Sequence, residues 1–160
     1  MSREVQPATL VFLRKDDEIL LAMKKRGFGE GLWNGVGGKV DDGESYKQAA
    51  IRETEEEIGV TPVKLNQTFE LFFDYSNGPS EKDFLVKVFT SYEWEGEPAE
   101  SEEMRPQWFT LDSIPYDKMW DDDRFWLPKL LAGRILKATV IFDEKSQVAD
   151  YSESELTPED

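Results

Sequence analysis

Three glutamates near the middle of the chain are spaced so that their carboxylates can act together. Glu53, Glu56 and Glu57 are separated by three and four positions, which places them on one face of a helix. Like charges at this spacing repel each other, Glu55 adds another, and Arg52 is the cation close to them in sequence. Such a set of oxygen ligands suits a hard divalent cation, Mg²⁺ or Mn²⁺. The alternative interpretation is a solvated acidic helix face.

Capping residues predict where the helix that carries these glutamates begins and ends. Ser45 and Gln48 form a capping box, which predicts that the helix begins just after Ser45. Gly59 is suited to the left-handed position that ends a helix. Gly37 and Gly38 precede the helix, and glycine permits turns and close backbone approach. The sequence therefore predicts a glycine-rich turn that leads into an acidic helix.

The composition is that of a globular protein with an acidic surface. The 160 residues fit one domain, which we expect to span residues 1–160, with a loose acidic tail at residues 152–160. A formal net charge of −15 repels phosphate backbones, so we expect no nucleic acid polymer as a partner. An anionic small substrate would need a cation to enter, in agreement with the metal hypothesis, although such a charge also serves solubility.

The absence of two residue types excludes several kinds of catalytic and metal-binding site. The sequence contains no Cys and no His, which excludes disulfides, Cys/His zinc sites, a catalytic cysteine and proton transfer by histidine. Carboxylates, Lys, Tyr or metal-bound water remain as proton-transfer groups. No apolar run could span a membrane, and the N-terminus lacks the apolar core of a signal peptide. We expect a cytoplasmic monomer without a membrane partner.

The pattern of apolar residues predicts an α+β fold. Strands are expected at residues 9–13, 19–23, 64–75, 84–92, 105–110, 137–142 and 148–151. A second helix is expected at residues 121–131, with Asp121 as its N-cap and with Phe125, Leu127, Leu130 and Leu131 buried. Strands interspersed with two main helices favour a mixed β-sheet flanked by helices, an αβα sandwich. The basic triplet Lys24, Lys25 and Arg26 is either a solvated turn or a phosphate or substrate contact.

The region from Gly38 to Val60 resembles the Nudix box. The match consists of Gly38, Glu44 and the run RETEEEIGV at residues 52–60, with Thr54 where the family usually has an aliphatic residue. The resemblance implies the Nudix fold and an Mg²⁺-dependent hydrolase of nucleoside diphosphate-linked compounds. It implies that Arg52 orients the glutamates and that Glu44 braces the loop against the helix. The metal ligands that it implies are Glu53, Glu56, Glu57 and the carbonyl of Gly37.

Three further stretches resemble one Nudix branch, the MutT-type hydrolases of oxidised purine nucleoside triphosphates. They are residues 23–35 (MKKRGFGEGLWNG), residues 103–109 (EMRPQWF) and residues 114–128 (IPYDKMWDDDRFWLP). The similarity extends from Thr9 to about Tyr151. It implies that Glu103 approaches the metal. It also implies a substrate site formed by Thr9, Lys24, Phe28, Asn34, Gly37, Gly38, Lys39, Phe72, Phe84, Trp120, Asp122 and Asp123.

The chemistry of these side chains can be compared with that of a purine. Trp120 and Phe28 offer flat apolar faces, and Asn34 offers a donor and an acceptor. Asp122 and Asp123 belong at the end of the ligand that carries N–H groups, because carboxylates repel a triphosphate. Two adjacent carboxylates do not both ionise cheaply, so one should keep its proton. Our hypothesis is that such a pair of acids recognises more than one oxidised purine by redistributing this proton. The alternative for the acids is helix capping, and the alternative for Trp120 is packing in the core.

The expected reaction is hydrolysis of an 8-oxo-dGTP-type or 2-hydroxy-dATP-type nucleotide to the monophosphate and pyrophosphate. Mg²⁺ would neutralise developing charge and acidify the attacking water. Glu56 or Glu57 is the first choice for activating that water, and Glu103 is the second. One alternative is a Nudix pyrophosphohydrolase for a methylated purine nucleotide, a nucleotide sugar or a dinucleotide polyphosphate. The other is a non-enzymatic acidic metal-binding module.

Overall fold

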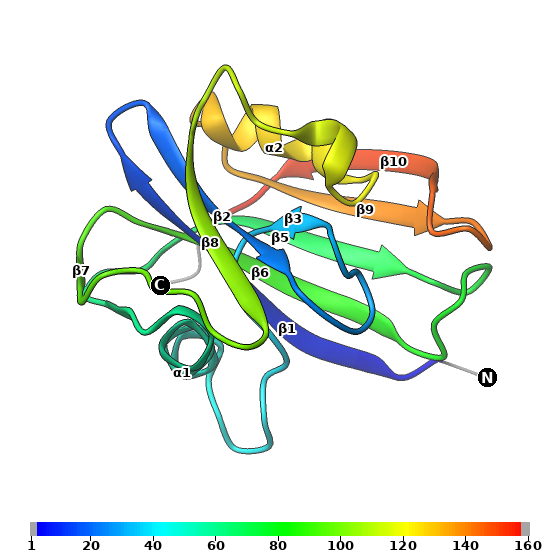
Figure 1. Ribbon diagram of the computed structural model, residues 1–160. Helices are drawn as coiled ribbons and strands as arrows, with labels where there is room; N and C mark the ends of the chain where they lie inside the picture. The colour runs from blue at the N-terminus through cyan, green and yellow to red at the C-terminus, as the bar shows by residue number, and fades with distance from the viewer. Residues whose placement is uncertain (1–2, 158–160) are drawn as a thin grey trace.

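A mixed β-sheet with a helix on each side organises the chain in the computed structural model, which describes residues 3–157 (Figure 1). The main strands are β1 (Val5–Lys15), β2 (Glu18–Lys24), β3 (Trp33–Asn34), β5 (Asn66–Asp74), β6 (Asp83–Ser91), β8 (Met104–Thr110), β9 (Leu136–Phe142) and β10 (Val148–Glu155). Their order is β10-β9-β5-β6-β1-β2-β3, with β8 beside β2. The β1–β6 and β5–β9 pairs are parallel, and the others are antiparallel. The short strands β4 (Thr61–Pro62) and β7 (Trp94–Glu95) form a separate pair.

The predicted mixed sheet flanked by helices is confirmed, and each predicted strand is present within a few residues of its expected bounds. The prediction of a loose tail is wrong for residues 152–155. These residues continue β10 and pair with residues 136–139 of β9. Glu153 also forms an ion pair with Lys129, so backbone pairing and charge hold this segment. Residues 156–157 follow β10 outside any strand, and residues 158–160 lie outside the described residues.

Helix α1 (Tyr46–Ile58) begins and ends where the sequence predicts. The Ser45 hydroxyl accepts a hydrogen bond from the Gln48 N–H at 3.1 Å, and the Gln48 side chain accepts one from the Ser45 N–H at 2.8 Å. Gly59 follows in the left-handed conformation, with φ of 73°. Thr54 is fully buried, and its hydroxyl donates to the Ala50 carbonyl at 2.7 Å. A threonine therefore fits this apolar position, because its hydroxyl is satisfied within the helix.

Helix α2 (Asp123–Leu131) begins two residues later than predicted, and Asp121 is not its N-cap. The Asp121 carboxylate instead accepts hydrogen bonds from the Val148 N–H and the Arg124 Nε, each at 2.9 Å. It therefore ties the start of β10 to the segment before α2. Asp122 occupies the N-cap position without a capping bond from its side chain. The buried residues are Asp123, Trp126, Leu127 and Leu130, whereas Phe125 and Leu131 are only partly buried.

The central strand β1 separates two hydrophobic cores. Phe12 points to the α2 side, where it packs with Phe69 and Trp126. Val11 and Leu13 point to the α1 side. Burial on both faces explains why the middle of β1 is a continuous apolar run rather than an alternating one. In the part of the chain that the structure describes, no helix combines the length and apolarity needed to cross a membrane.

Candidate active site

The glycine turn before α1 lies directly against the acidic helix. A Cβ on Gly38 would be 2.5 Å from the Glu53 carboxylate, and a Cβ on Gly37 would be 2.1 Å from the Thr9 carbonyl oxygen. The Thr9 N–H donates to the Gly38 carbonyl at 2.8 Å, which fixes the turn to β1. A side chain at Gly37 would clash with the backbone of β1, whereas one at Gly38 would push the end of the Glu53 side chain out of its present position. The two glycines therefore allow this close packing of turn, strand and helix.

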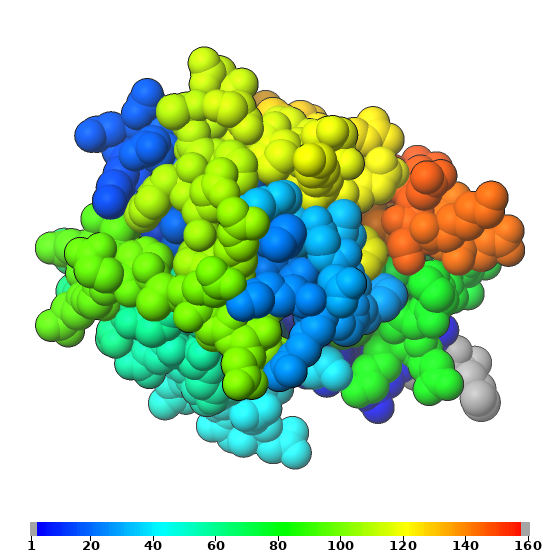
Figure 2. Space-filling view, viewed as in Figure 1, coloured from blue at the N-terminus to red at the C-terminus, as the bar shows by residue number. Residues whose placement is uncertain are grey.

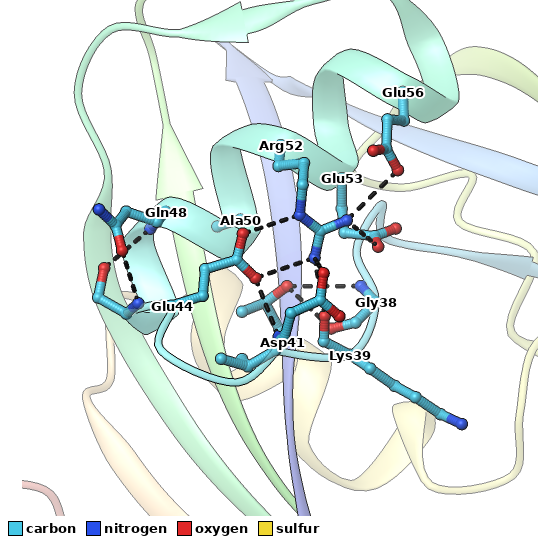
Figure 3. A network of polar contacts seen from close by, with 12 residues as sticks. Gly38, Lys39, Asp41, Glu44, Gln48, Ala50, Arg52, Glu53 and Glu56 are labelled. Carbon is cyan, nitrogen blue, oxygen red and sulfur yellow. Dashed lines mark hydrogen bonds and ion pairs between the residues drawn. The ribbon is translucent and has the colours of Figure 1, made fainter.

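Arg52 is the centre of a polar network that joins this turn to α1 (Figure 3). Its guanidinium donates to both carboxylate oxygens of Glu44, at 2.8 and 3.0 Å. It also donates to Glu53 at 2.8 Å, to Glu56 at 3.3 Å and to the Lys39 carbonyl at 3.1 Å. It also pairs with the Asp41 carboxylate at 3.4 Å. A single planar cation thus contacts four carboxylates and one carbonyl, which the fork geometry of arginine allows.

Glu44 connects the loop to the helix in this network. Its carboxylate accepts the N–H of Asp41 at 3.0 Å as well as the bidentate bond from Arg52. The hydrogen bond from Arg52 and, after it, the Asp41 N–H lower the pKa of Glu44 to about 2. This geometry fits the bracing role that the Nudix resemblance implies for Glu44.

Glu57 occupies a different environment from the other glutamates of α1. Burial raises the pKa of Glu57 to about 8, and two effects of Glu53 act in the same direction: its carboxylate accepts a hydrogen bond from the protonated Glu57, and its negative charge disfavours ionisation of Glu57. The charge of Lys24 acts in the opposite direction. One carboxylate oxygen of Glu57, Oε2, is buried and has no hydrogen-bond partner among the described residues. A buried carboxylate oxygen without a partner is costly, and a cation or a proton would relieve that cost.

The carboxylates predicted to hold a metal do not point to a common centre. Across residues 3–157, no group of three acidic side chains is arranged to hold an ion. Glu56 turns toward Arg52, and Glu103 turns toward Arg26 at 3.4 Å. The partnerless oxygen of Glu57 and the all-oxygen character of the set nevertheless fit a hard divalent cation. Glu56 and Glu103 would have to exchange an arginine contact for that ion.

A pocket of about 310 Å³ extends from the glycine turn toward the start of α2. It lies between β1, the β2–β3 loop, the β5–β6 hairpin and the segment before α2, so residues far apart in sequence meet in it. The predicted substrate residues that line it are Thr9, Lys24, Phe28, Asn34, Gly37, Gly38, Phe84, Trp120, Asp122 and Asp123.

Two predicted substrate residues do not line this pocket. In the register of the β5–β6 hairpin, Phe73 lies opposite Phe84, so these two share a face of the sheet. Phe72 therefore faces the other side, where it borders a separate depression with Glu70. Lys39 is exposed and contributes its carbonyl to Arg52. Sequence reasoning missed Phe73 as a lining residue, although the alternation along β5 was a usable signal.

Trp120 and Phe28 form one wall of the pocket. Their ring centroids are 5.1 Å apart, and their planes are tilted by 39°. Phe28 is 71% exposed, and it is held over Trp120 by a loop in which Gly29 has φ of 89°. A Cβ on Gly29 would already be 3.0 Å from the Trp120 ring. This wall offers the apolar face that a flat aromatic ligand needs.

Two buried carboxylates form the far end of the pocket. Asp122 and Asp123 are 4% and 2% exposed. Burial raises the pKa of Asp122 to about 6, although a hydrogen bond from Trp126 Nε1 at 2.8 Å opposes the rise. Burial and then the charge of Asp122 raise the pKa of Asp123 well above its ordinary value, and its Oδ2 has no partner among the described residues. At neutral pH this favours an ionised Asp122 beside a protonated Asp123, in line with the expected sharing of one proton.

The basic triplet divides between two tasks. Lys24 lines the pocket, but Lys25 and Arg26 pair with the acidic loop before β8. Lys25 donates to the Glu100 carboxylate and, at 2.9 Å, to the Ser101 carbonyl. Two of the three cations are therefore already occupied by carboxylates, which disfavours a phosphate-binding role for them.

Comparison with known proteins gives consistent matches over most of the chain. The family model described as NUDIX domain matches residues 4–130. The chain is 41% identical over 148 residues to the oxidized purine nucleoside triphosphate hydrolase of Mus musculus, covering 92% of this chain and 94% of that protein. It is 49% identical over 123 residues to the protein of the same name from Danio rerio, covering 77% and 78%.

A solved structure has a similar fold. The MutT protein from Bacillus halodurans superposes with a TM-score of 0.80, covering 92% of this chain and 97% of that one, at 25% sequence identity. This similarity extends over nearly the whole of both chains.

Proposed function

This chain belongs to the Nudix family of hydrolases, and from that premise we propose that it hydrolyses oxidised purine nucleoside triphosphates to the monophosphate and pyrophosphate. One observation carries the proposal: a single pocket has two buried acids at one end and, at the other, the glycine turn that packs against Glu53. The pocket thus offers a place for a base with N–H groups and leads to the carboxylate cluster of α1. Two relatives that match most of the chain are named for this substrate class.

At the base end, each residue has a distinct task in the proposal. The rings of Trp120 and Phe28 stack on the purine and exclude water from it. The ionised Asp122 accepts a hydrogen bond from a base N–H, and the protonated Asp123 donates one to a base nitrogen or oxygen. If the single proton moved from Asp123 to Asp122, Asp122 would become the hydrogen-bond donor and Asp123 the acceptor. This exchange would let the same pocket bind guanine-type and adenine-type oxidised bases.

At the phosphate end, the proposal assigns a divalent metal site to the acidic helix. Nudix hydrolases generally use divalent metal ions, and we propose Mg²⁺, with Mn²⁺ as a substitute. Glu53, Glu56, Glu57, Glu103 and the Gly37 carbonyl would hold it. When bound, the cation neutralises phosphate charge and lowers the pKa of water. Arg52 keeps Glu53 and Glu56 in place, and Glu56 or Glu57 accepts the proton of the attacking water, with Glu103 as the second choice.

The location and assembly of the protein are part of the same proposal. We propose a cytoplasmic monomer of one domain that acts on free nucleotides. A net charge of −15 disfavours binding to a nucleic acid polymer, because phosphate backbones would be repelled. The pocket encloses about 310 Å³, a size that suits a single base rather than a stretch of polymer.

A turnover assay tests the proposal directly. Pyrophosphate release is measured with 8-oxo-dGTP, 2-hydroxy-dATP, methylated purine triphosphates, dGTP and a nucleotide sugar, with Mg²⁺ and then with EDTA. We expect pyrophosphate to be released faster from the oxidised purine triphosphates than from dGTP. With EDTA we expect no release. A preference for the nucleotide sugar, or turnover that survives chelation, would reject the assigned substrate or the metal dependence.

Variants of the acids separate their roles. Glu56→Gln should abolish turnover and leave nucleotide binding largely intact, because it removes a base without reshaping the pocket. A fully active Glu56→Gln enzyme would remove that residue from the mechanism. Asp122→Asn and Asp123→Asn should change activity on guanine-type and adenine-type substrates by different factors. Equal losses on both substrates for both variants would contradict the shared-proton hypothesis.

A further inference from the structure

Tyr75 lines the substrate pocket, although no pattern in the sequence singled it out. It directly follows β5 and lies two residues beyond Phe73, so both side chains face the pocket side of the sheet. Phe84 and Asp122 line the same pocket. Tyr75 therefore places a phenol at the base end of the site, on the side of the β5–β6 hairpin.

The Tyr75 ring is fixed from several directions. It stacks on Phe142 with a centroid distance of 4.6 Å and an angle of 11°, and it meets Phe84 edge-on at 5.9 Å. The Tyr75 N–H donates to the buried Asp83 carboxylate at 2.8 Å. A turn then brings Gly78 against the ring, where a Cβ would be 2.8 Å from Tyr75 Cδ1. A side chain held this firmly is pre-organised for recognition, because little conformational entropy is lost on binding.

The hydroxyl of Tyr75 is an available, neutral hydrogen-bonding group. Burial and then the negative charge of Asp122 raise the pKa of Tyr75 above its ordinary value, so the phenol keeps its proton. Within residues 3–157 the hydroxyl makes no hydrogen bond. Other polar groups of the pocket are partly engaged: Thr9 donates to the Gly38 carbonyl, and Asn34 accepts from the N–H of Gly35. Tyr75 can thus serve a ligand without giving up an existing bond.

We propose that the Tyr75 hydroxyl is a third base-recognition group that donates a hydrogen bond to an oxo group on the purine edge. The inference rests on the proposed function, which supplies a purine for this pocket. An ionised Asp122 attracts base N–H groups, whereas a neutral donor attracts a carbonyl oxygen. Tyr75 would therefore favour guanine-type substrates, which carry a 6-oxo group, over adenine-type substrates, which carry an amino group there.

The variant Tyr75→Phe tests this, because it removes the hydroxyl and keeps the stacked ring. We expect kcat/KM on 8-oxo-dGTP to fall about three- to tenfold, and kcat/KM on 2-hydroxy-dATP to change by less than about twofold. The loss should appear in KM with kcat nearly unchanged, because the bond is equally strong before and during the reaction. Tyr151→Phe is the matched control: it deletes a buried hydroxyl that has no hydrogen-bond partner among the described residues, at a ring that does not line the pocket.

A second variant moves the ring without deleting the hydroxyl. Gly78→Ala forces the turn or the Tyr75 ring to shift, so its substrate ratio should change in the same direction. An unchanged ratio in Tyr75→Phe, or equal losses on both substrates, would overturn the inference whatever Gly78→Ala does. A change of the same size in the substrate ratio of Tyr151→Phe would also overturn the inference. If the unmodified protein fails to hydrolyse any purine triphosphate, it is the proposed function that is refuted.

Discussion

Replacing Asp122 by asparagine should stabilise the protein, and the gain should grow with pH. Asp122 is buried and ionises at about pH 6 in the folded chain, compared with an ordinary value of 3.8. Asparagine has nearly the same shape, and its oxygen can still accept the hydrogen bond from Trp126 Nε1. It carries no charge to bury. The substitution also removes the negative charge that raises the pKa of Asp123.

The sign and size follow from linkage between protonation and folding. A raised pKa means that the folded state holds its proton more tightly, so Asp122 supports folding below its ordinary pKa of 3.8. That support is lost as the pH rises from 3.8 through about 6, and the whole change amounts to about 3 kcal/mol. At about pH 8 the variant should therefore gain up to about 3 kcal/mol in free energy of unfolding, and roughly half of that at about pH 5.

Urea unfolding followed by tryptophan fluorescence at both pH values measures this gain. Asp121→Asn is the matched control, because the hydrogen bond from Arg124 lowers the pKa of Asp121 instead of raising it. Asp121 therefore supports folding above its ordinary pKa, and Asp121→Asn should destabilise the protein at about pH 8. The reasoning is refuted if Asp122→Asn is no more stable than the unmodified chain at the higher pH, or if its gain is independent of pH.

Three further variants test the acidic helix and its turn. Gly38→Ala should lower kcat/KM by about 100-fold or more, because its Cβ would lie 2.5 Å from the Glu53 carboxylate and displace it. Activity equal to that of the unmodified enzyme would show that the Glu53 side chain can move aside without loss of function. Arg52→Lys should return the pKa of Glu44 from about 2 toward 4.5, because lysine cannot form the bidentate bond. NMR titration of Glu44 measures this pKa, and a pKa that stays near 2 would contradict the reasoning. Gly59→Ala should cost about 1 kcal/mol in urea unfolding, because its φ of 73° disfavours a side chain; a loss near zero would mean that the helix ends differently.

Phe72 and Asp121 illustrate where sequence reasoning failed. Whether Phe72 or Phe73 faces the pocket depends on the pairing of β5 with β6, which includes an irregularity between Gln67 and Phe69. A shift by one residue moves every side chain to the other face, and the sequence of β5 is aromatic on both faces. Asp121 looked like a helix cap, but it bonds to Val148, a residue distant in sequence. The alternation along β5 indicated the face of Phe73, whereas the contact of Asp121 with Val148 has no local signature.

The features that the sequence determined by itself are local. The capping box at Ser45, the left-handed end at Gly59 and the shared face of the glutamates depend on residues within one helix, where spacing fixes geometry. The positions of Asp122 and Tyr75 depend on contacts across the fold. Their burial, the raised pKa values and the fixed phenol arise only when α2, the sheet and the β5–β6 hairpin pack together. Desolvation and side-chain facing are properties of that packing, so only the tertiary structure could decide them.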